Sequence, residues 1–229
     1  MARNAILIGN SDGIGLATSE ALLMRGWSVM GISRSASSIS DPSYQHTIAR
    51  VQNADFPEKL KSIMDSIESV DLCIYCAGIG ELLDPLNMAG EIEIFDVNLM
   101  GMIRTAAYVI PVMVRQGKGH FIGISSVADE LISPEAPSYH ASKAAFSNYL
   151  YGLALALKST GVHISNMRFG FVNTKMAKGD VKPFMMEVEK AAHHVLACIE
   201  KKSITYTAPR IVIPLVKLRR WIFKLKIIR

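Results

Sequence analysis

Tyr139 and Lys143 lie four residues apart in the segment YHASK (139–143). In a helix, this spacing places the two side chains one turn apart on the same face. An ammonium group beside a phenol favours the phenolate and lowers the pKa of the tyrosine, so the phenol can exchange a proton with a substrate oxygen. Because pairs with this spacing also arise by chance, the assignment needs a second group that could act on the same substrate.

Ser126 is a candidate for that second group. It ends the apolar run GHFIGISS (119–126), which we expect to be a strand, and it precedes Tyr139 by thirteen residues. In a parallel α/β sheet, the carboxyl ends of the strands and the beginnings of the following helices border the ligand crevice. A serine hydroxyl and a tyrosine phenol can therefore meet there over one carbonyl group.

Glycines mark another candidate site near the N-terminus. Gly9, Gly13 and Gly15 stand in the run IGNSDGIGLA (8–17), between the first strand-like segment and the first helix-like segment. Glycines at such a turn permit close approach of the backbone to a pyrophosphate, and the N-terminus of the helix favours negative charge. A plain tight turn is the alternative interpretation.

The segments that must position these groups alternate between short apolar strands and longer helices. We expect helices over 13–25, 57–69, 91–115 and 138–159, and strands over 5–9, 27–33, 47–52, 70–78, 119–126 and 162–170. Apolar strands separated by helices predict a parallel sheet covered on both faces. The expected fold class is therefore α/β, a doubly wound, Rossmann-like sheet of about seven strands. We expect a single domain, with its main body in 1–203 and a last strand and a basic tail in 204–229.

The helix expected from 138 is apolar almost all the way round, over YHASKAAFSNYLYGLALAL (139–157). A helix of this kind is buried on two sides. We expect one face to pack on the sheet and the other on a second subunit, in a homodimer or homotetramer. The alternative is that the C-terminal segment of the same chain covers the second face.

Composition narrows the class of protein. Residues 204–229 hold seven lysines and arginines and no acid, whereas the rest of the chain carries 18 basic and 20 acidic side chains, so the body has no charge pattern for nucleic acid. No apolar run approaches the roughly 18 residues of a membrane span, and no signal sequence is recognisable. The three cysteines do not make a disulfide framework, so we expect a cytoplasmic protein. The histidines lack the spacing of metal ligands, and we expect no metal site.

Several motifs follow one another in a fixed order and together resemble the short-chain dehydrogenase/reductase family, from the first strand to about Thr174. They are GNSDGIG (9–15), ADF (54–56), CAG (76–78), VNLMG (97–101), ISS (124–126), YHASK (139–143) and FGFVNT (169–174). The resemblance implies an NAD(P)-dependent oxidoreductase that transfers a hydride between its cofactor and a small carbonyl or alcohol substrate. The alternative is a catalytically silent dinucleotide-binding protein with a regulatory or scaffold role.

The resemblance also implies a role for each matching residue. Tyr139 would be the general acid or base, and Lys143 would lower its pKa and hold the nicotinamide ribose. Ser126 would polarise the substrate carbonyl, and Asn98 would help to hold a water in a proton relay behind Lys143. Asp55 would be the acid on the adenine side. With Tyr139 and Lys143, the implied cofactor-binding residues are Gly9, Ser11, Asp12, Gly13, Ile14, Gly15, Ser33, Arg34, Asp55, Ala77, Gly78 and Thr174.

Two positions depart from the family pattern. Cys76 stands where asparagine is usual, and Phe169 replaces the usual proline before Gly170. The first change removes a polar group near the cofactor, and the second alters the loop beside the nicotinamide. Neither belongs to the set of serine, tyrosine and lysine described above, so we expect activity to be retained.

The segment GISRS (31–35), at the end of the second strand, bears on the choice of cofactor. Ser33 stands about where an acid would accept hydrogen bonds from the adenosine ribose of NAD, and Arg34 can pair with a 2′-phosphate. This favours NADP(H), with NAD(H) as the alternative. Asp12 opposes that preference, because some NADP-using relatives carry a basic residue at this position and a carboxylate there would repel a phosphate.

The tail PLVKLRRWIFKLKIIR (214–229) predicts a short amphipathic helix. An apolar stripe of Leu218, Trp221, Ile222, Leu225 and Ile228 would lie beside the basic side chains Lys217, Arg220 and Lys224. Such a helix can lie on an anionic membrane surface, so peripheral membrane contact through residues 215–229 is one interpretation. The other is docking on the chain's own fold or on a neighbouring subunit.

Overall fold

Seven parallel strands form one sheet in the order β3-β2-β1-β4-β5-β6-β7. The computed structural model describes residues 3–177 and 184–227, with side chains as far as residue 222. The predicted fold class, a single-domain, Rossmann-like α/β sheet, is confirmed. The strands are β1 (Asn4–Ile8), β2 (Ser28–Ser33), β3 (Tyr44–Ile48), β4 (Leu72–Tyr75), β5 (Gly119–Ser126), β6 (Val162–Phe169) and β7 (Thr205–Ala208).

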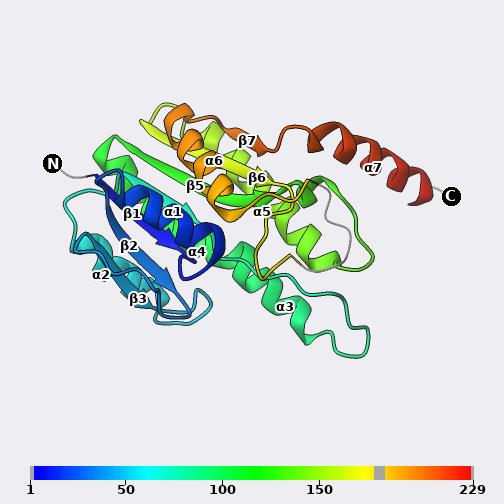
Figure 1. Ribbon diagram of the computed structural model, residues 1–229, viewed down its shortest axis with the longest axis horizontal. Helices are drawn as coiled ribbons and strands as arrows, with labels where there is room; N and C mark the ends of the chain where they lie inside the picture. Colours follow the sequence, from blue (N-terminus) through cyan, green and yellow to red (C-terminus); the bar gives the residue numbers. More distant parts are fainter. Residues whose placement is uncertain (1–2, 178–183, 228–229) are drawn as a thin grey trace.

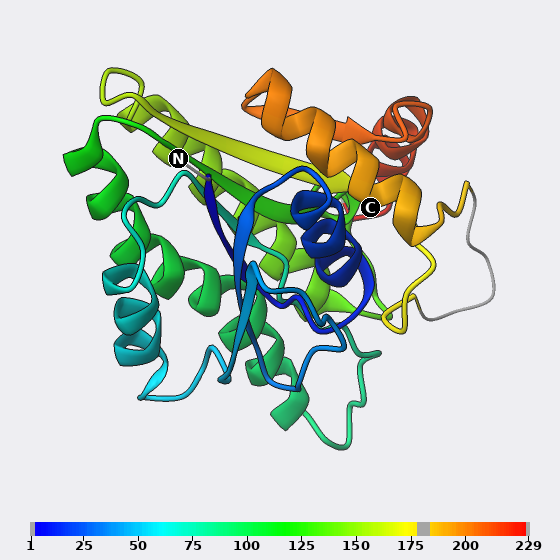
Figure 2. The same ribbon diagram turned by 60° about the vertical axis from the view of Figure 1, so that its left-hand side comes forward.

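Helices cover both faces of this sheet (Figures 1 and 2). α1 and α6 lie side by side on one face, and α2, α4 and α5 pack on the other. The helices are α1 (Gly13–Leu23), α2 (Phe56–Asp65), α3 (Ala89–Phe95), α4 (Gly101–Gln116), α5 (Pro137–Ala156), α6 (Val188–Lys201) and α7 (Val212–Ile227), with a π-helical turn η1 (Asp96–Met100) and a 3-10 turn η2 (Val127–Glu130).

The strands contribute side chains to two apolar layers, because successive side chains of a strand point to opposite faces of the sheet. Ile8 of β1 lies in the layer covered by α2, α4 and α5, and its neighbour Leu7 lies in the layer under α1 and α6. The cysteines near β4 separate in the same way: Cys73 belongs to the first layer, Cys76 packs against the second, and both are free thiols. Burial on both faces explains why these strands are apolar almost throughout.

The edge strand β3 lies earlier in the chain than expected. The prediction was 47–52, whereas the strand runs from Tyr44 to Ile48 and the residues from Val51 form a turn. Ala49 and Val51 are buried because this turn packs into the layer that contains α2 and α4. Their apolar character therefore reflects the turn, and the polar, half-exposed sequence YQHTI forms the strand.

The helix expected over 91–115 consists of three segments, α3, η1 and α4. The whole stretch Ala89–Gln116 is, among the described residues, the one helix long and apolar enough to cross a membrane, which differs from the expectation that no such run exists. Half of its most apolar window is buried inside the fold. The π-helical turn in the middle widens the helix at Asn98, and such turns are frequent at functional sites.

The C-terminal segment first joins the sheet and then leaves it. β7 pairs with β6, and α7 extends away from the body of the molecule (Figure 1). α7 contacts η2, whereas Ala141, Ala144 and Gly152 of α5 are exposed, so the described part of the tail does not cover that face of α5. Of the apolar stripe and the basic residues predicted for this helix, Leu225 and Lys224 lie outside the described side chains, and Ile228 lies outside the described residues.

Candidate active site

The carboxyl ends of the strands bring most of the predicted site residues to one edge of the sheet. Gly9 follows β1, Ser33 ends β2, Ala77 follows β4, Ser126 ends β5 and Thr174 follows β6. β1 and β4 are neighbours, and the chain builds the sheet outward in opposite directions from this pair. In open α/β sheets, a reversal of strand order of this kind opens a crevice for ligands at the carboxyl edge.

Ser126 and Tyr139 approach each other where β5 ends and α5 begins. The Ser126 hydroxyl accepts a hydrogen bond from the Ala128 amide and donates one to the Phe169 carbonyl, each at 3.2 Å. Pro137 begins α5 and places Tyr139 in its first turn, where the ring is half-buried. Burial raises the pKa of Tyr139, and a hydrogen bond with the Ser126 hydroxyl acts in the opposite direction. A hydroxyl and a phenol therefore share one site.

Lys143 lies one helical turn further along α5 and is only 5% exposed. Its Nζ donates to the Ile124 carbonyl at 3.0 Å and lies 6.0 Å from the centre of the Tyr139 ring. Burial lowers the pKa of Lys143 to about 8. The sequence predicted that Lys143 lowers the pKa of Tyr139; in the structure burial of the phenol dominates and raises it, because the ammonium group is bonded to backbone instead of to the phenol.

Asn98 connects the loop after β4 to α5. Its Oδ1 accepts from the Ile79 amide at 2.8 Å, and its Nδ2 donates to the Ile79 carbonyl at 2.9 Å and to Ser142 Oγ at 3.0 Å. A Cβ on Gly78 would lie 3.4 Å from Asn98 Oδ1 and 3.7 Å from Lys143 Nζ. The side chain thus positions backbone close to Lys143, and its role in a water relay stays a prediction.

The glycine-rich loop after β1 lies against the loop after β4. Gly9 has φ +86°, and a Cβ there would lie 2.5 Å from the Ala77 amide nitrogen. Ser11 is partly buried in this loop, and Ile14 is the second residue of α1. The first turn of α1 contains no acid, and a Cβ on Gly15 would lie 2.1 Å from the Gly9 carbonyl oxygen. Only glycine permits these two approaches, so the backbone remains accessible at the helix N-terminus.

Asp12 has a partner that the sequence did not reveal. Its Oδ1 accepts from the Gly13 amide at 2.8 Å and caps α1, and its Oδ2 lies 2.6 Å from Lys175 Nζ. The hydrogen bond from Lys175 holds the pKa of Asp12 below its usual value. Thr174 is also close, since a Cβ on Gly13 would lie 3.2 Å from its Cγ2. The segment after β6 therefore balances the negative charge of the glycine-rich loop.

A chain of hydrogen bonds joins the glycine-rich loop to the end of β2 through the edge strand β3. Asn10 Nδ2 donates to Tyr44 Oη at 2.8 Å, and Tyr44 Oη lies 2.9 Å from His46 Nδ1. His46 Nε2 lies 3.0 Å from the Ser35 carbonyl and 3.2 Å from Ser33 Oγ. Because a carbonyl only accepts, we assign the proton to Nε2, and Tyr44 then donates to Nδ1. This arrangement of donors and acceptors satisfies every one of these contacts.

Gly31, Arg34 and Arg50 complete the surroundings of these hydrogen bonds. A Cβ on Gly31 would lie 2.1 Å from Asn10 Nδ2, so glycine at this position makes room for the amide. Arg34 and Arg50 are both exposed, and the Ala49 amide donates to the Ser33 carbonyl at 2.9 Å. The two arginines therefore follow residues that are bonded to each other. Arg50 was not predicted as a site residue, because the strand expected over 47–52 placed it in the middle of the strand instead of after its end.

Asp55 stands apart from these groups. It immediately precedes α2, seven residues beyond the end of β3, and its Oδ2 lies 2.8 Å from Lys59 Nζ. Its assignment to the adenine side stays a prediction. In the residues that the structure describes, no three His, Cys, Asp or Glu side chains form a group that could hold a metal ion.

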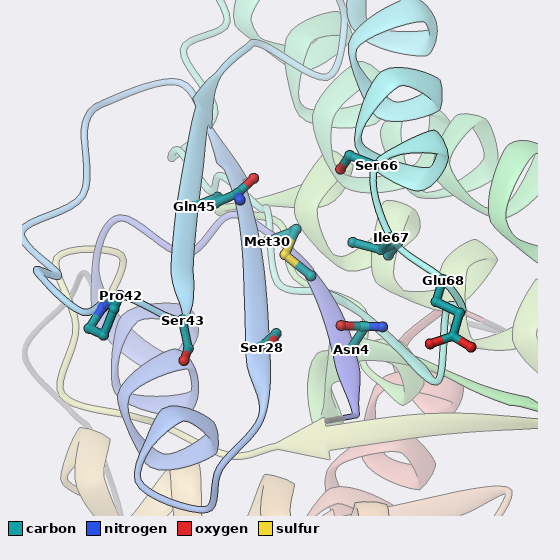
Figure 3. Close-up of a pocket in the computed structure, with 9 residues that line it drawn as sticks. All are labelled: Asn4, Ser28, Met30, Pro42, Ser43, Gln45, Ser66, Ile67 and Glu68. Carbon is teal, nitrogen blue, oxygen red and sulfur yellow. The ribbon is translucent and has the colours of Figure 1, made fainter. Parts of the chain in front are cut away.

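Two cavities border the sheet at opposite ends. One, of about 510 Å³, lies between the start of α1 and the segment after β6 and is lined in part by Gly13, Thr174 and Lys175. The other, of about 400 Å³, is shown in Figure 3 and lies where β1, β2 and β3 begin, beside the end of α2. Only the first is on the edge that carries Ser126, Tyr139 and Lys143.

The residues at the carboxyl edge fit a dinucleotide. The glycine-rich loop and the acid-free first turn of α1 suit a pyrophosphate, exposed cations stand at the end of β2, and a buried ammonium lies next to Gly78. The ring of Tyr139, whose hydroxyl is hydrogen-bonded to Ser126, has its centre 6.0 Å from that ammonium. The arrangement can bind phosphates at one end and exchange a proton at the other.

Comparison with known proteins identifies the family. A family model described as short chain dehydrogenase matches residues 3–183, and the chain belongs to this family. In sequence it is similar to a 3-oxoacyl-[acyl-carrier-protein] reductase of Synechocystis, with 29% identity over 208 residues that cover 84% of the chain and 83% of that protein. It is also similar to an uncharacterized oxidoreductase of Staphylococcus epidermidis, with 28% identity over 184 residues that cover 76% and 80% of the two chains.

Solved structures share the fold. A short-chain dehydrogenase from Burkholderia cenocepacia in complex with NADP has a TM-score of 0.84 at 22% identity, over 94% of this chain and 92% of that one. A short-chain dehydrogenase/reductase from Burkholderia phymatum in complex with NAD has a TM-score of 0.86 at 18% identity, over 98% and 95% of the two chains. At these identities the likeness concerns the fold.

Proposed function

We propose that the protein is an oxidoreductase that transfers a hydride between NADP(H) and a carbonyl or alcohol substrate. The observation that carries the proposal is the meeting of Ser126, Tyr139 and buried Lys143 at the carboxyl edge of the sheet, beside a glycine-rich loop that suits a pyrophosphate. A bound nicotinamide dinucleotide supplies the hydride, and the chain has to move one proton at the substrate oxygen.

Each catalytic group would act on that oxygen or beside it. In reduction, the Tyr139 hydroxyl gives its proton to the oxygen, and the Ser126 hydroxyl donates a hydrogen bond to the same atom; in oxidation the proton returns to Tyr139. Lys143 favours the phenolate that results and holds the nicotinamide ribose. The raised pKa of Tyr139 suits a phenol that keeps its proton until it meets a substrate.

The preference for NADP(H) rests on the end of β2. Ser33 replaces an acid, its hydroxyl is turned to the Ser35 carbonyl, and Arg34 and Arg50 are free to face a 2′-phosphate. Lys175 balances the carboxylate of Asp12, which weakens the repulsion expected from the sequence. Relatives of this fold have been solved with either NADP or NAD, so NAD(H) is the alternative.

The substrate that we propose carries an apolar group beside its carbonyl. Exposed apolar side chains stand on the loops that follow the carboxyl ends of β4, β5 and β6. They are Leu82 and Leu86 after β4, Ile132 after β5, and Phe171, Met176, Phe184 and Met185 after β6. The similarity to a 3-oxoacyl-[acyl-carrier-protein] reductase supports a carbonyl with an acyl chain.

The exposed face of α5 supports assembly. Ala141, Ala144 and Gly152 leave an open, nearly uncharged surface on this helix, and we propose that it packs against a second copy in a homodimer or homotetramer. Sedimentation equilibrium of the full chain, compared with an Ala144→Glu variant, tests this proposal.

A cofactor-absorbance screen of carbonyl compounds tests the activity. The panel comprises short and long 3-oxoacyl thioesters, aliphatic ketones and aldehydes, each with NADPH and with NADH. We expect turnover with a long-chain carbonyl, loss of at least about a thousandfold in kcat for Tyr139→Phe, and unchanged NADPH binding by that variant.

A neighbouring tyrosine provides the control. Tyr149→Phe changes the same atoms on α5 outside the site and is expected to keep full activity. If wild type and Tyr139→Phe bind NADPH equally and neither converts any compound, the catalytically silent dinucleotide-binding protein becomes the better description.

A further inference from the structure

The outer face of α7 is apolar and open. Its inner face rests on the fold through Val212 and Val216, each 7% exposed. The outer residues recur at the spacing of one helical stripe, and Leu218 and Trp221 remain 55% and 61% exposed. The outer face consists of Leu215, Leu218, Trp221 and Ile222, together with Ile211 directly before the helix.

Basic side chains border this outer face. At 100° per residue, Lys217 falls on one side of the apolar stripe and Arg219 on the other, and both are exposed. Arg220 lies further round, toward the fold, where its guanidinium is 3.5 Å from a Glu130 carboxylate oxygen and ties α7 to η2. The described residues from 204 to 222 contain four cations and no acid. The face therefore suits a partner that is both apolar and anionic.

The position of α7 in the fold determines which side of the molecule would face an anionic surface. It follows the carboxyl end of β7, so it belongs to the same edge of the sheet as Ser126 and Tyr139. The acids Glu81, Asp84, Glu91 and Glu93 lie in and before α3, which Figure 1 shows across this edge from α7. An anionic surface would attract the α7 side of the edge and repel the α3 side.

We propose that the outer face of α7 binds the surface of an anionic phospholipid bilayer. The helix lies in the interfacial plane with its apolar stripe below the headgroups and its cations among the phosphates. A second copy of the chain fits the same face less well, because the described residues of this segment carry cations and no acid, so a two-fold contact brings cations of both copies together without opposite charges. Docked in this way, the α7 side of the site edge faces the membrane.

This inference does not rest on the oxidoreductase activity. If the proposed apolar carbonyl substrate is correct, docking brings the site next to the phase in which such a substrate dissolves. The binding experiment reads vesicle association and no turnover, so its failure and the failure of the proposed function are distinguishable.

Vesicle co-sedimentation of the full chain tests the proposal. We expect the protein to pellet with vesicles of phosphatidylglycerol and phosphatidylcholine, and its binding to fall at least about tenfold on vesicles of phosphatidylcholine alone or in high salt. Leu218→Glu, which places a charge in the apolar stripe, should lower binding to the anionic vesicles by at least about tenfold. Lys217→Glu should lower it by a smaller factor and should not alter residual binding to the neutral vesicles.

Met24→Glu is the matched control, because Met24 is 83% exposed and follows α1 away from the tail. It should bind vesicles like the wild type, and all variants should keep the melting temperature of the wild type. The proposal is overturned if the wild type does not pellet with anionic vesicles, or if Leu218→Glu pellets as well as the wild type. It is also overturned if Leu218→Glu changes only the oligomeric state, which would make the face a contact between copies.

Discussion

Arg34 and Arg50 are sixteen residues apart in the chain, but each directly follows one partner of a hydrogen bond between the ends of β2 and β3. The hydrogen bond from the Ala49 amide to the Ser33 carbonyl brings their two segments together at the carboxyl ends of β2 and β3. Both side chains are exposed, so each can reach a phosphate without losing an existing partner buried in the fold. Guanidinium groups bind phosphate oxygens through paired hydrogen bonds, so arginines at these two positions suit a 2′-phosphate.

Arg34→Ala is therefore expected to raise the KM for NADPH by about tenfold or more, since hydrogen bonds between charged groups are among the strongest in proteins. The KM for NADH should change by less than about twofold, because NAD has no phosphate at this position. Steady-state kinetics with both cofactors measures the difference.

Arg115→Ala removes an exposed arginine at the end of α4 and serves as the control for a general change in charge. Equal increases in KM for NADPH and NADH in the Arg34 variant would show that Arg34 does not distinguish the two cofactors.

Site residues that end a strand or begin a helix could be predicted from sequence. Ser126 and Tyr139 both occupy such positions, and the structure places them at the same edge of the sheet. The ion pair of Asp12 with Lys175 could not be predicted, because it joins residues that are distant in the chain through the path of the segment after β6. The pKa of Tyr139 was also inaccessible, since it depends on how deeply the folded chain buries the phenol.

At the scale of elements, the edge strand β3 does more than extend the sheet. Tyr44 and His46 point to the same face because they are two residues apart on a strand, and they connect Asn10 in the glycine-rich loop to Ser33 and Ser35. The strand thus fixes the loop that presents Arg34. The strand could not be recognised as an apolar run, because its sequence is polar. The same polar side chains make the hydrogen bonds of this connection.

His46→Ala should raise the KM for NADPH by about three- to tenfold and leave kcat within about twofold, because it removes one hydrogen bond each from Tyr44 and the Ser35 carbonyl and loosens the loop. His46→Gln, which retains an amide that can donate and accept, should recover part of the loss. Initial-rate kinetics with saturating substrate separates the two parameters.

Gln45→Ala is the matched control, since Gln45 is exposed and lies between the two linked residues on the opposite face of β3. A parallel fall in kcat and in thermal stability of the His46 variant would mean that the residue supports the fold as a whole instead of the cofactor loop.

The elements buried on both faces were the most predictable ones. β5 runs over 119–126 as expected, because Gly117 and Gly119 mark its start and two serines close its apolar run. The helix around Asn98 was predicted as continuous, and the π-helical turn was missed because it follows from packing against β4 and α5 instead of from residue type. The edge strand was misplaced for the opposite reason, as it has little apolar surface to bury.

At the scale of the whole molecule, the burial of Lys143 makes the free energy of unfolding depend on pH. The folded chain holds the pKa of Lys143 at about 8, below its ordinary value of 10.5. Between these two values the unfolded chain binds more protons than the folded chain, so the contribution of Lys143 to stability rises with pH across this window. Below about pH 8 both states are protonated and the full cost of burying the charge remains.

Lys143→Met should therefore be more stable than the wild type at pH 7, by about 3 to 4 kcal/mol at most if each pKa unit contributes about 1.4 kcal/mol. The difference should shrink as pH approaches 10.5. Urea unfolding of both proteins from pH 7 to 10.5 measures it. Titration of other buried groups, such as Cys73 and Tyr75, occurs in both proteins and largely cancels. A difference that stays constant over this range would show that folding does not lower the pKa of Lys143, so that the buried ammonium keeps its charge as it does in the unfolded chain.

The order of the strands also separates the chain in a way that matters for recombination. The residues that we propose for the adenosine end, from Gly9 to Arg50, all precede β4, whereas the proposed catalytic residues Asn98, Ser126, Tyr139 and Lys143 all follow it. A single genetic crossover near residue 70 would exchange one set without altering the other. The residues proposed for cofactor choice and those proposed for proton transfer can thus be exchanged as separate units. The sequence that supplies the second part must keep a basic residue at position 175 to pair with Asp12.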